Sequence, residues 1–352
     1  MFSPIEQKHQ NVNLPKGKEI QSLAKQWAKK YVQNLEDHTD SLDANRESSA
    51  KNQRLLIAEK LRYSLRNTSL QAWHKTEYLI GKEIQRHRIN PNLIDPWQIC
   101  EDVFTVYEKT LEIYAQMLSP QYLSRIISPY LGGIRKKYTA NDPRVIGFVS
   151  MQFHYTGLIL IEDLSLRNKN ELLSYLKVID DHLYMPLQRA YDAAANQDYE
   201  SKNLIVVQQL LPASTEIARN ICDRVIELYP NYSTYSGSLK NPVIKTASIR
   251  DVEMFQVYLW VCVLENSIAG IQQELFPLCV MLYPTLKVRW ELVRQMINLL
   301  GKEIGNRLGR EQQQLFVPYF QALREMFSPE VFPESYIDEL KDYRRGGRGI
   351  VI

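Results

Sequence analysis

The stretch VIGFVSMQFHYTGLILI, residues 145–161, contains no Asp, Glu, Lys or Arg. Asp142 and Arg144 precede it, and Glu162 and Asp163 follow it. Its seventeen residues only just reach the length that spans a bilayer, and the polar side chains within it disfavour insertion. An uncharged run of this kind is typical of a helix that is buried on all sides. The run therefore predicts the central helix of a soluble protein.

The rest of the chain has the composition of a folded helical protein. Of its 352 residues, 45% are hydrophobic and 24% charged, and glycine is scarce at 14 residues. Apolar residues recur at three- and four-residue steps, as in Leu23, Trp27 and Tyr31. We find no alternating strand pattern and no repeat of 34 or 40 residues. These patterns predict an all-α fold, a multi-helix bundle of about ten helices with no significant β-sheet.

Two breaks divide the chain. Residues 37–50 are polar and turn-rich, which predicts a mobile linker. The segment NPNLIDPW at 90–97 contains two prolines, each of which restricts the residue before it. We therefore expect a basic N-terminal helical region over 1–95, a main helical bundle over 96–340 and a flexible Arg/Gly tail over 341–352.

The charge and the cysteines of the chain indicate its cellular compartment and the class of its partners. The formal net charge is only +3, with the basic excess at the two ends of the chain. This distribution disfavours a dedicated nucleic-acid binder, which presents a concentrated basic face. The four cysteines form no C-x-x-C pair, and the polar N-terminus carries no signal peptide. We therefore expect a cytoplasmic protein with free thiols.

The N-terminal helices are basic and amphipathic. A helix of this kind can lie on an anionic membrane surface, although acidic residues dilute the charge here. The favoured interpretation is a solvated face packed on the rest of the fold, with peripheral membrane contact as the alternative. The basic residues concerned are Lys25, Lys29, Lys30, Arg54, Lys60, Arg62 and Arg66.

His154 is the histidine within the uncharged stretch. The favoured interpretation is a core histidine hydrogen-bonded to a neighbouring helix, because buried polar groups need partners. The alternative is a ligand of haem or another tetrapyrrole. Gly147 and Gly157 would then let a flat cofactor or a neighbouring helix approach closely.

Asp180, Asp181 and His182 form a D-D-H run. Dimetal carboxylate bundles use E-x-x-H at helical spacing, and no histidine of this chain lies in that motif. We interpret the run as a solvated helix surface and expect no metal site.

No catalytic motif is present. Cys262 and Cys279 lie in apolar runs, where a thiol behaves as a small hydrophobic group and its pKa rises. No nucleophile elbow, phosphate loop or dinucleotide fingerprint occurs. The sequence thus favours a protein that is not an enzyme and has no cofactor.

Two segments are candidates for binding a protein partner. Tyr229, Tyr232 and Tyr235 lie in the loop YPNYSTYSGS, whose composition resembles an adaptable recognition surface. The C-terminal tail interleaves arginines with glycines and ends in apolar residues that could add to a partner's sheet edge or groove. The tail residues concerned are Arg344, Arg345, Arg348, Ile350 and Ile352.

The leading hypothesis is a helical interaction protein: an adaptor, assembly factor or regulator that binds a protein partner through the tyrosine loop, the tail or both. The alternative is a helical cofactor-binding or sensor domain with a tetrapyrrole or lipid-like ligand near His154.

Overall fold

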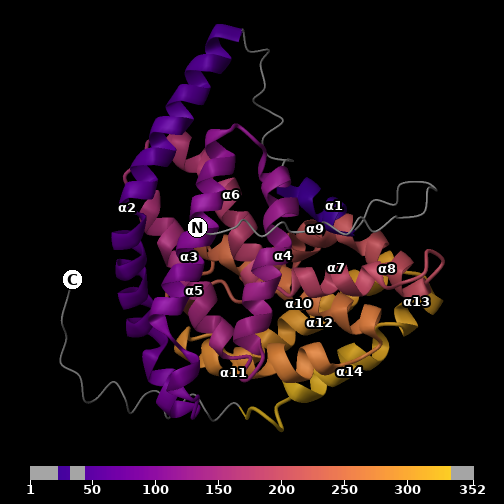
Figure 1. Ribbon diagram of the computed structural model, residues 1–352. Coiled ribbons are helices and arrows are strands. Elements are labelled where there is room, and N and C mark those ends of the chain that lie inside the picture. The colour runs from indigo at the N-terminus through magenta and orange to yellow at the C-terminus, as the bar shows by residue number, and fades with distance from the viewer. Residues whose placement is uncertain (1–22, 32–43, 334–352) are drawn as a thin grey trace, which may run out of the picture.

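The computed structural model describes residues 23–31 and 44–333, and most of these residues are helical (Figure 1). The α-helices are α1 (Leu23–Ala28), α2 (Ala44–Arg86), α3 (Pro96–Ala115), α4 (Pro120–Thr139), α5 (Val145–Leu160), α6 (Leu166–Tyr184), α7 (Leu187–Ala195), α8 (Lys202–Leu210), α9 (Ser214–Leu228), α10 (Pro242–Glu265), α11 (Phe276–Thr285), α12 (Trp290–Arg307), α13 (Arg310–Gln314) and α14 (Val317–Met326). Short 3₁₀ turns are η1 (Lys29–Tyr31), η3 (Pro91–Leu93) and η4 (Leu211–Ala213), and η5 (Gly270–Leu275) is a π-helix.

The predicted all-α class is confirmed. In the described part of the chain, the strands are β1 (Ser233–Thr234) and β2 (Gly237–Ser238), which pair antiparallel as a short hairpin. This hairpin was not predicted from the sequence, and β2 begins at Gly237, directly after the turn, with a φ of +125°. None of the described helices combines the length and hydropathy that a bilayer-spanning segment requires.

Several helices begin with a side-chain cap followed by proline. Asp95 accepts hydrogen bonds from the backbone N–H groups of Trp97 and Gln98, and Pro96 opens α3. Ser119 with Pro120 does the same for α4, and Asn241 with Pro242 for α10. Proline is favourable here because the first helical N–H has no intrahelical partner. The Asn241-Pro242 pair thus marks the start of α10.

The most enclosed helix is α10, not α5. Every residue from Val252 to Leu264 is buried. The prediction that residues 145–161 are buried on all sides was wrong, because Ser150 and His154 are half-buried and Leu158 is exposed. These three positions recur every four residues and form one outward stripe of α5. The uncharged run is long enough to fill the core side of α5 and still leave this stripe near solvent.

Two prolines divide helical segments of the chain. Pro186 separates α6 from α7, and Pro212 lies in η4 between α8 and α9. Proline cannot donate the helical hydrogen bond, so each of these segments forms two helices. Residues 44–86, by contrast, form one continuous helix, α2. Since α2 begins at Ala44, residues 44–50 of the expected linker are helical.

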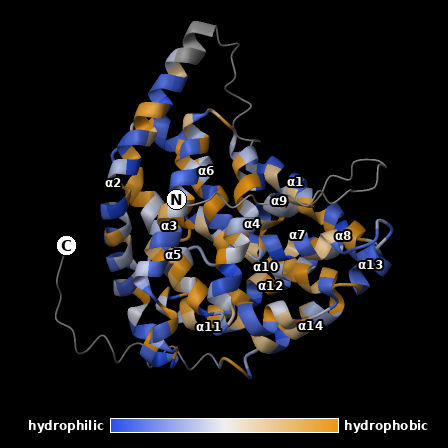
Figure 2. Cartoon of the chain, viewed as in Figure 1, coloured by the Kyte–Doolittle hydropathy of each residue, from blue (hydrophilic) through white to orange (hydrophobic). Residues whose placement is uncertain are grey.

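The N-terminal elements pack on the rest of the fold. Helix α2 lies along α3 and α5, and its first turns project beyond the other helices (Figure 1). Figure 2 shows that hydrophilic residues predominate along the outer edge of α2. Helix α1 contacts α4 and α7, with Trp27 fully buried against Trp260. The division of the chain at residue 95 stays a prediction.

Lys30 was predicted to lie on a solvated helix face, but the structure places it in a contact with α10. Its ammonium lies 2.7 Å from the carboxylate of Glu253 and donates to the Ser214 hydroxyl at 2.9 Å. Its side chain is only 12% exposed. Desolvation lowers the pKa of Lys30, and Glu253 opposes that shift. Turn η1 therefore contributes the cation of a buried ion pair that fixes the N-terminal segment to α10.

Candidate functional site

A half-enclosed cleft of about 150 Å³ lies where α9, the β1–β2 hairpin, α10, α11 and the start of α12 meet. Its walls are mainly aliphatic, with a few polar groups among them. The polar and sulfur-bearing lining residues are Cys222, Thr234, Ser236, Lys245, Ser248, Asp251, Tyr283 and Met296. A cavity with apolar walls and a few convergent polar groups is the usual form of a small-molecule site.

Asp251 is the acidic residue of this cleft. The Tyr184 hydroxyl donates a 2.5 Å hydrogen bond to its Oδ1. Burial raises the pKa of Asp251, while the Tyr184 hydrogen bond and the nearby Arg250 guanidinium lower it. The net shift is upward, so desolvation outweighs both stabilising contacts. Asp251 is thus a carboxylate that is incompletely compensated by the protein and can accept hydrogen bonds from a ligand.

Next to Asp251, a charged chain connects α10 to α6 and α5. Arg250 lies 3.3 Å from the carboxylate of Asp180, and its guanidinium stacks over the Tyr184 ring at 4.6 Å. Asp180 also lies 2.7 Å from Nδ1 of His154. The pKa of Asp180 is lowered overall because His154 and Arg250 together outweigh its desolvation. This chain fixes Arg250 beside the cleft.

The tyrosine loop covers one side of the cleft. The Tyr232 hydroxyl donates to the carbonyl of Lys287 at 2.6 Å and accepts from the backbone N–H of Arg289 at 2.9 Å. The Tyr229 hydroxyl donates to Glu291 at 3.1 Å. Tyr235 is 48% exposed, while its backbone N–H donates to Leu286 at 2.9 Å. Two of the three predicted partner-binding tyrosines therefore bind the hairpin to the start of α12.

Three cationic side chains lie at the cleft or adjoin residues that line it. Lys245 lines it and pairs with Asp223 on the neighbouring turn of α9. Lys287 and Arg289 lie over the rings of Tyr235 and Tyr232, at 5.6 Å and 4.7 Å from the ring centroids. Neither of these two forms an ion pair with any residue that the structure describes. These cations can therefore attract carboxylate groups of a ligand.

The cleft also contains two potential nucleophiles. Burial raises the pKa of the Cys222 thiol to about 12, with Asp251 and Asp223 adding to the shift. The Ser248 hydroxyl donates to the carbonyl of Ile244 at 3.0 Å. Both groups are thus held in weakly reactive states.

The surroundings of His154 differ from the expectation of a flat cofactor on α5. A Cβ on Gly157 would lie 2.7 Å from the Tyr107 hydroxyl, and one on Gly147 would lie 2.9 Å from Cε of Met281. The two glycines therefore admit neighbouring side chains. His154 is hydrogen-bonded to a neighbouring helix, but it is half-buried and lies on the outward stripe of α5.

The interpretation of the D-D-H run as a solvated surface was wrong. Asp181 and His182 are each 1% exposed. Asp181 accepts from Lys177 at 2.9 Å and from the Tyr31 hydroxyl at 3.0 Å. These partners come from the same helix and from η1, and the second could not be anticipated from local sequence. Among the described residues no cluster of three or more His, Cys, Asp or Glu could hold a metal ion.

Other predicted binding residues are placed as follows. Arg54 pairs with Glu171 on α6, and the Arg66 guanidinium lies 5.3 Å from the Phe104 ring centroid. Peripheral membrane contact through the N-terminal helices stays a prediction. The tail residues Arg344, Arg345, Arg348, Ile350 and Ile352 lie outside the described residues.

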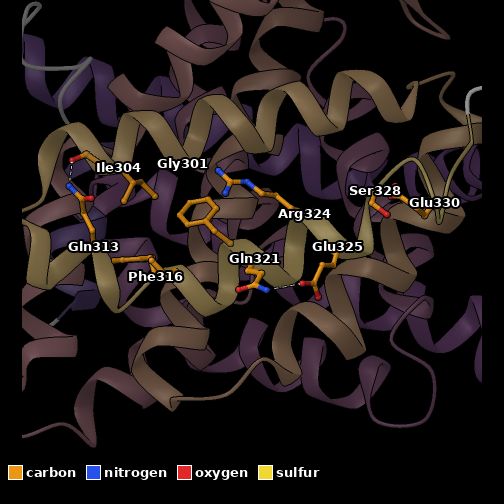
Figure 3. Close-up of a pocket in the computed structure, with 12 residues that line it drawn as sticks. Gly301, Ile304, Gln313, Phe316, Gln321, Arg324, Glu325, Ser328 and Glu330 are labelled. Carbon is orange, nitrogen blue, oxygen red and sulfur yellow. Dashed lines mark hydrogen bonds between the residues drawn. The ribbon is translucent and has the colours of Figure 1, made fainter.

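A second, larger depression of about 630 Å³ lies between α12 and α14 (Figure 3). Most of its polar groups bond to their own surroundings: Gln313 donates to the carbonyl of Gly305 at 2.8 Å, and Gln321 donates to Glu325 at 3.0 Å. Figure 3 shows Arg324 directed toward Gly301. This groove has no buried carboxylate, so its chemistry is less specific than that of the cleft.

Comparison with known proteins places the cleft within a family match. The family described as "Phycobilisome protein" matches residues 177–326, which is less than half of the chain. All five elements that form the cleft lie in this range. No curated protein and no solved structure matches the chain.

This match corrects the expectation that the chain has no cofactor. Proteins of the matched family typically carry covalently bound bilins, which are open-chain tetrapyrroles. The family fold is all-helical and globin-like, in agreement with the helices described above. Over residues 177–326 the chain is thus similar to a family of helical, pigment-bearing proteins.

Proposed function

We propose that this chain is a helical bilin-binding protein that holds an open-chain tetrapyrrole at the cleft between α9, α10, α11 and the β1–β2 hairpin. The observation that carries the proposal is Asp251, a half-buried and desolvated carboxylate that lines an apolar cleft within the family match. The proposed site is the cleft that contains Asp251, whereas the alternative hypothesis from the sequence had the tetrapyrrole near His154.

The polar groups of the cleft fit the chemistry of a bilin. Pyrrole N–H groups are hydrogen-bond donors, and Asp251 offers them a desolvated acceptor. Propionate groups are anionic, and Lys245, Lys287 and Arg289 lie at the cleft or beside its lining residues and can pair with them. Aliphatic residues of α9, α11 and α12 supply the apolar contact that the ring system needs. When bound, the bilin would supply absorption of visible light.

The volume of the cleft limits how much of a tetrapyrrole it can enclose. Sites for drug-sized ligands usually measure roughly 300–1,000 Å³, and this cleft measures about 150 Å³. The cleft therefore takes part of a tetrapyrrole, and the remainder extends across the mouth beside Tyr235. Displacement of the β1–β2 hairpin would enlarge the contact, because the hairpin covers one side of the cleft.

Titration with biliverdin, an open-chain tetrapyrrole dicarboxylate, tests the proposal. Binding should change the visible absorption of the pigment and saturate at one pigment per chain. Asp251→Asn keeps the acceptor oxygen for Tyr184 but removes the charge. It should weaken binding about tenfold, since hydrogen bonds to charged groups contribute roughly 1.5–3 kcal/mol.

Glu227→Gln is the matched control, because Glu227 lies on α9 with its side chain 63% exposed and outside the cleft. Its affinity for biliverdin should equal that of the unaltered chain. A chain that leaves the absorption spectrum of biliverdin unchanged, or variants that weaken binding equally, would contradict the proposed site.

The hypothesis of an interaction protein stays a prediction. A protein partner is compatible with bilin binding, since proteins of the matched family assemble with other proteins. Of the two predicted contact segments, the tyrosine loop offers mainly Tyr235 to a partner, because Tyr232 is buried.

A further inference from the structure

The thiols within the family match are all buried. Cys222, Cys262 and Cys279 have exposed fractions of 5%, 0% and 1%. Covalent attachment of a tetrapyrrole through cysteine requires addition of a thiolate to a carbon–carbon double bond, with a new S–C bond and a proton gained by the adjacent carbon. The thiolate is the reactive form, so burial in apolar surroundings opposes this addition.

Only one of these three thiols belongs to the cleft. Cys222 lines the wall contributed by α9, whereas Cys262 and Cys279 lie elsewhere in the core on α10 and α11. Burial raises the pKa of Cys222 to about 12 and that of Cys262 to about 11, and it also raises the pKa of Cys279. At neutral pH all three are thiols.

Lys245 lowers the pKa of Cys222, but it offsets this effect only in part. The Lys245 ammonium is the cleft cation that could stabilise a thiolate, but it pairs with Asp223. Asp223, Asp251 and Glu253 all act to disfavour a thiolate at Cys222. Cys100, the remaining cysteine, lies on α3 beside Gln152 and outside the family match.

The cleft nevertheless has the groups for non-covalent retention. Asp251 is a desolvated acceptor, Lys287 and Arg289 adjoin lining residues of the cleft, and Tyr232 binds the covering hairpin to the start of α12. We propose, on the basis of the function proposed above, that the chain holds its open-chain tetrapyrrole without a covalent bond and can therefore release it intact. This sets it apart from the covalent attachment typical of the matched family.

The test uses the full chain and phycocyanobilin, a bilin whose ethylidene side chain can add a thiol. After overnight incubation, one half of the sample is desalted under native conditions and its visible absorption is read. The other half is denatured in SDS and separated on a gel stained with zinc, which makes protein-linked bilins fluoresce. We expect pigment to elute with the native chain and no fluorescent band at the mass of the denatured chain.

Two results would overturn the inference in different ways. Pigment in the native fraction together with a fluorescent band would overturn non-covalent retention while leaving the proposed function intact. Absence of pigment from the native fraction would overturn the proposed function itself, and the inference with it.

A variant of Cys222 shows whether a fluorescent band would come from this thiol. Cys222→Ala should give no fluorescent band, as in the unaltered chain, because no bond to its sulfur is formed. If the unaltered chain gave a fluorescent band that Cys222→Ala lacked, a covalent role for this thiol would replace the inference. Cys262→Ala is the matched control, since Cys262 is equally buried but does not line the cleft.

Discussion

The Tyr184 hydroxyl donates a 2.5 Å hydrogen bond to Asp251, across the boundary between α6 and α10. Both residues are half-buried, and desolvation raises the pKa of Tyr184 far above its usual value. Asp251 thus has one fixed neutral donor, and the guanidinium of Arg250 is directed to Asp180. This arrangement leaves a desolvated carboxyl group whose protonation affects both stability and ligand binding.

The first prediction concerns the pH dependence of stability. Because the folded pKa of Asp251 is raised, the folded state retains a proton at pH values where the unfolded carboxyl has lost it. The contribution of Asp251 to stability is therefore largest below the ordinary carboxyl pKa and falls as pH rises through the folded pKa. Urea denaturation from pH 4 upward should show this decline in the unaltered chain relative to Asp251→Asn. Parallel curves for the two proteins would contradict it.

The buried pair between Lys30 and Glu253 leads to a second prediction. Lys30→Met should lower the free energy of unfolding by about 3 kcal/mol, since removal of one partner leaves a buried charge poorly compensated. Lys177, at 3.9 Å from Glu253, supplies only partial compensation. The double variant Lys30→Met with Glu253→Gln should be more stable than Lys30→Met alone. Urea midpoints measure both effects.

Lys109→Met is the control for this ion pair, because Lys109 pairs with Glu112 at the surface. Exposed pairs contribute little, so its unfolding midpoint should stay close to that of the unaltered chain. Equal losses in Lys30→Met and Lys109→Met would show that burial of the Lys30 pair has no energetic consequence.

Two helical glycines provide a third prediction. Gly157→Ala should cost about 1–3 kcal/mol, because the added methyl group displaces Tyr107. The Tyr107 hydroxyl is fixed by a 2.7 Å hydrogen bond to the carbonyl of Phe153. Gly133→Ala has nothing within 4 Å of the new carbon and should instead stabilise α4 by about 0.5–1 kcal/mol. Thermal denaturation should thus move in opposite directions for the two variants.

The fourth prediction concerns the hairpin that covers the cleft. Tyr232→Phe removes the hydrogen bond to Lys287 and the acceptor of the Arg289 N–H group. Amide hydrogen exchange over residues 230–240 should accelerate, and bound biliverdin should dissociate faster because its cover opens more often. Tyr235→Phe is the matched control, since no hydrogen bond of the Tyr235 hydroxyl occurs among the described residues. Unchanged exchange in Tyr232→Phe would refute this role.

The sequence determined the fold class. Apolar residues at helical spacing, scarce glycine and cap–proline pairs such as Asp95-Pro96 act locally, so the helical class could be predicted from short stretches of sequence. The buried state of the cysteines in apolar runs was predictable for the same reason. A tetrapyrrole was also an alternative prediction from the sequence. Its site was predicted near His154 because this residue is the histidine of the uncharged run.

Tertiary structure alone decided which polar residues are buried and which of them meet. Lys30 looked like a surface residue and Asp181 like a solvated carboxylate, and Asp251 was not among the predicted site residues. Each is shielded from solvent because helices distant in sequence pack over it and supply a partner: Glu253, Tyr31 and Tyr184. Periodicity reports the apolar face of one helix, whereas the burial of a charge depends on compensation by another element. The cleft arises from such long-range packing, which no local pattern encodes.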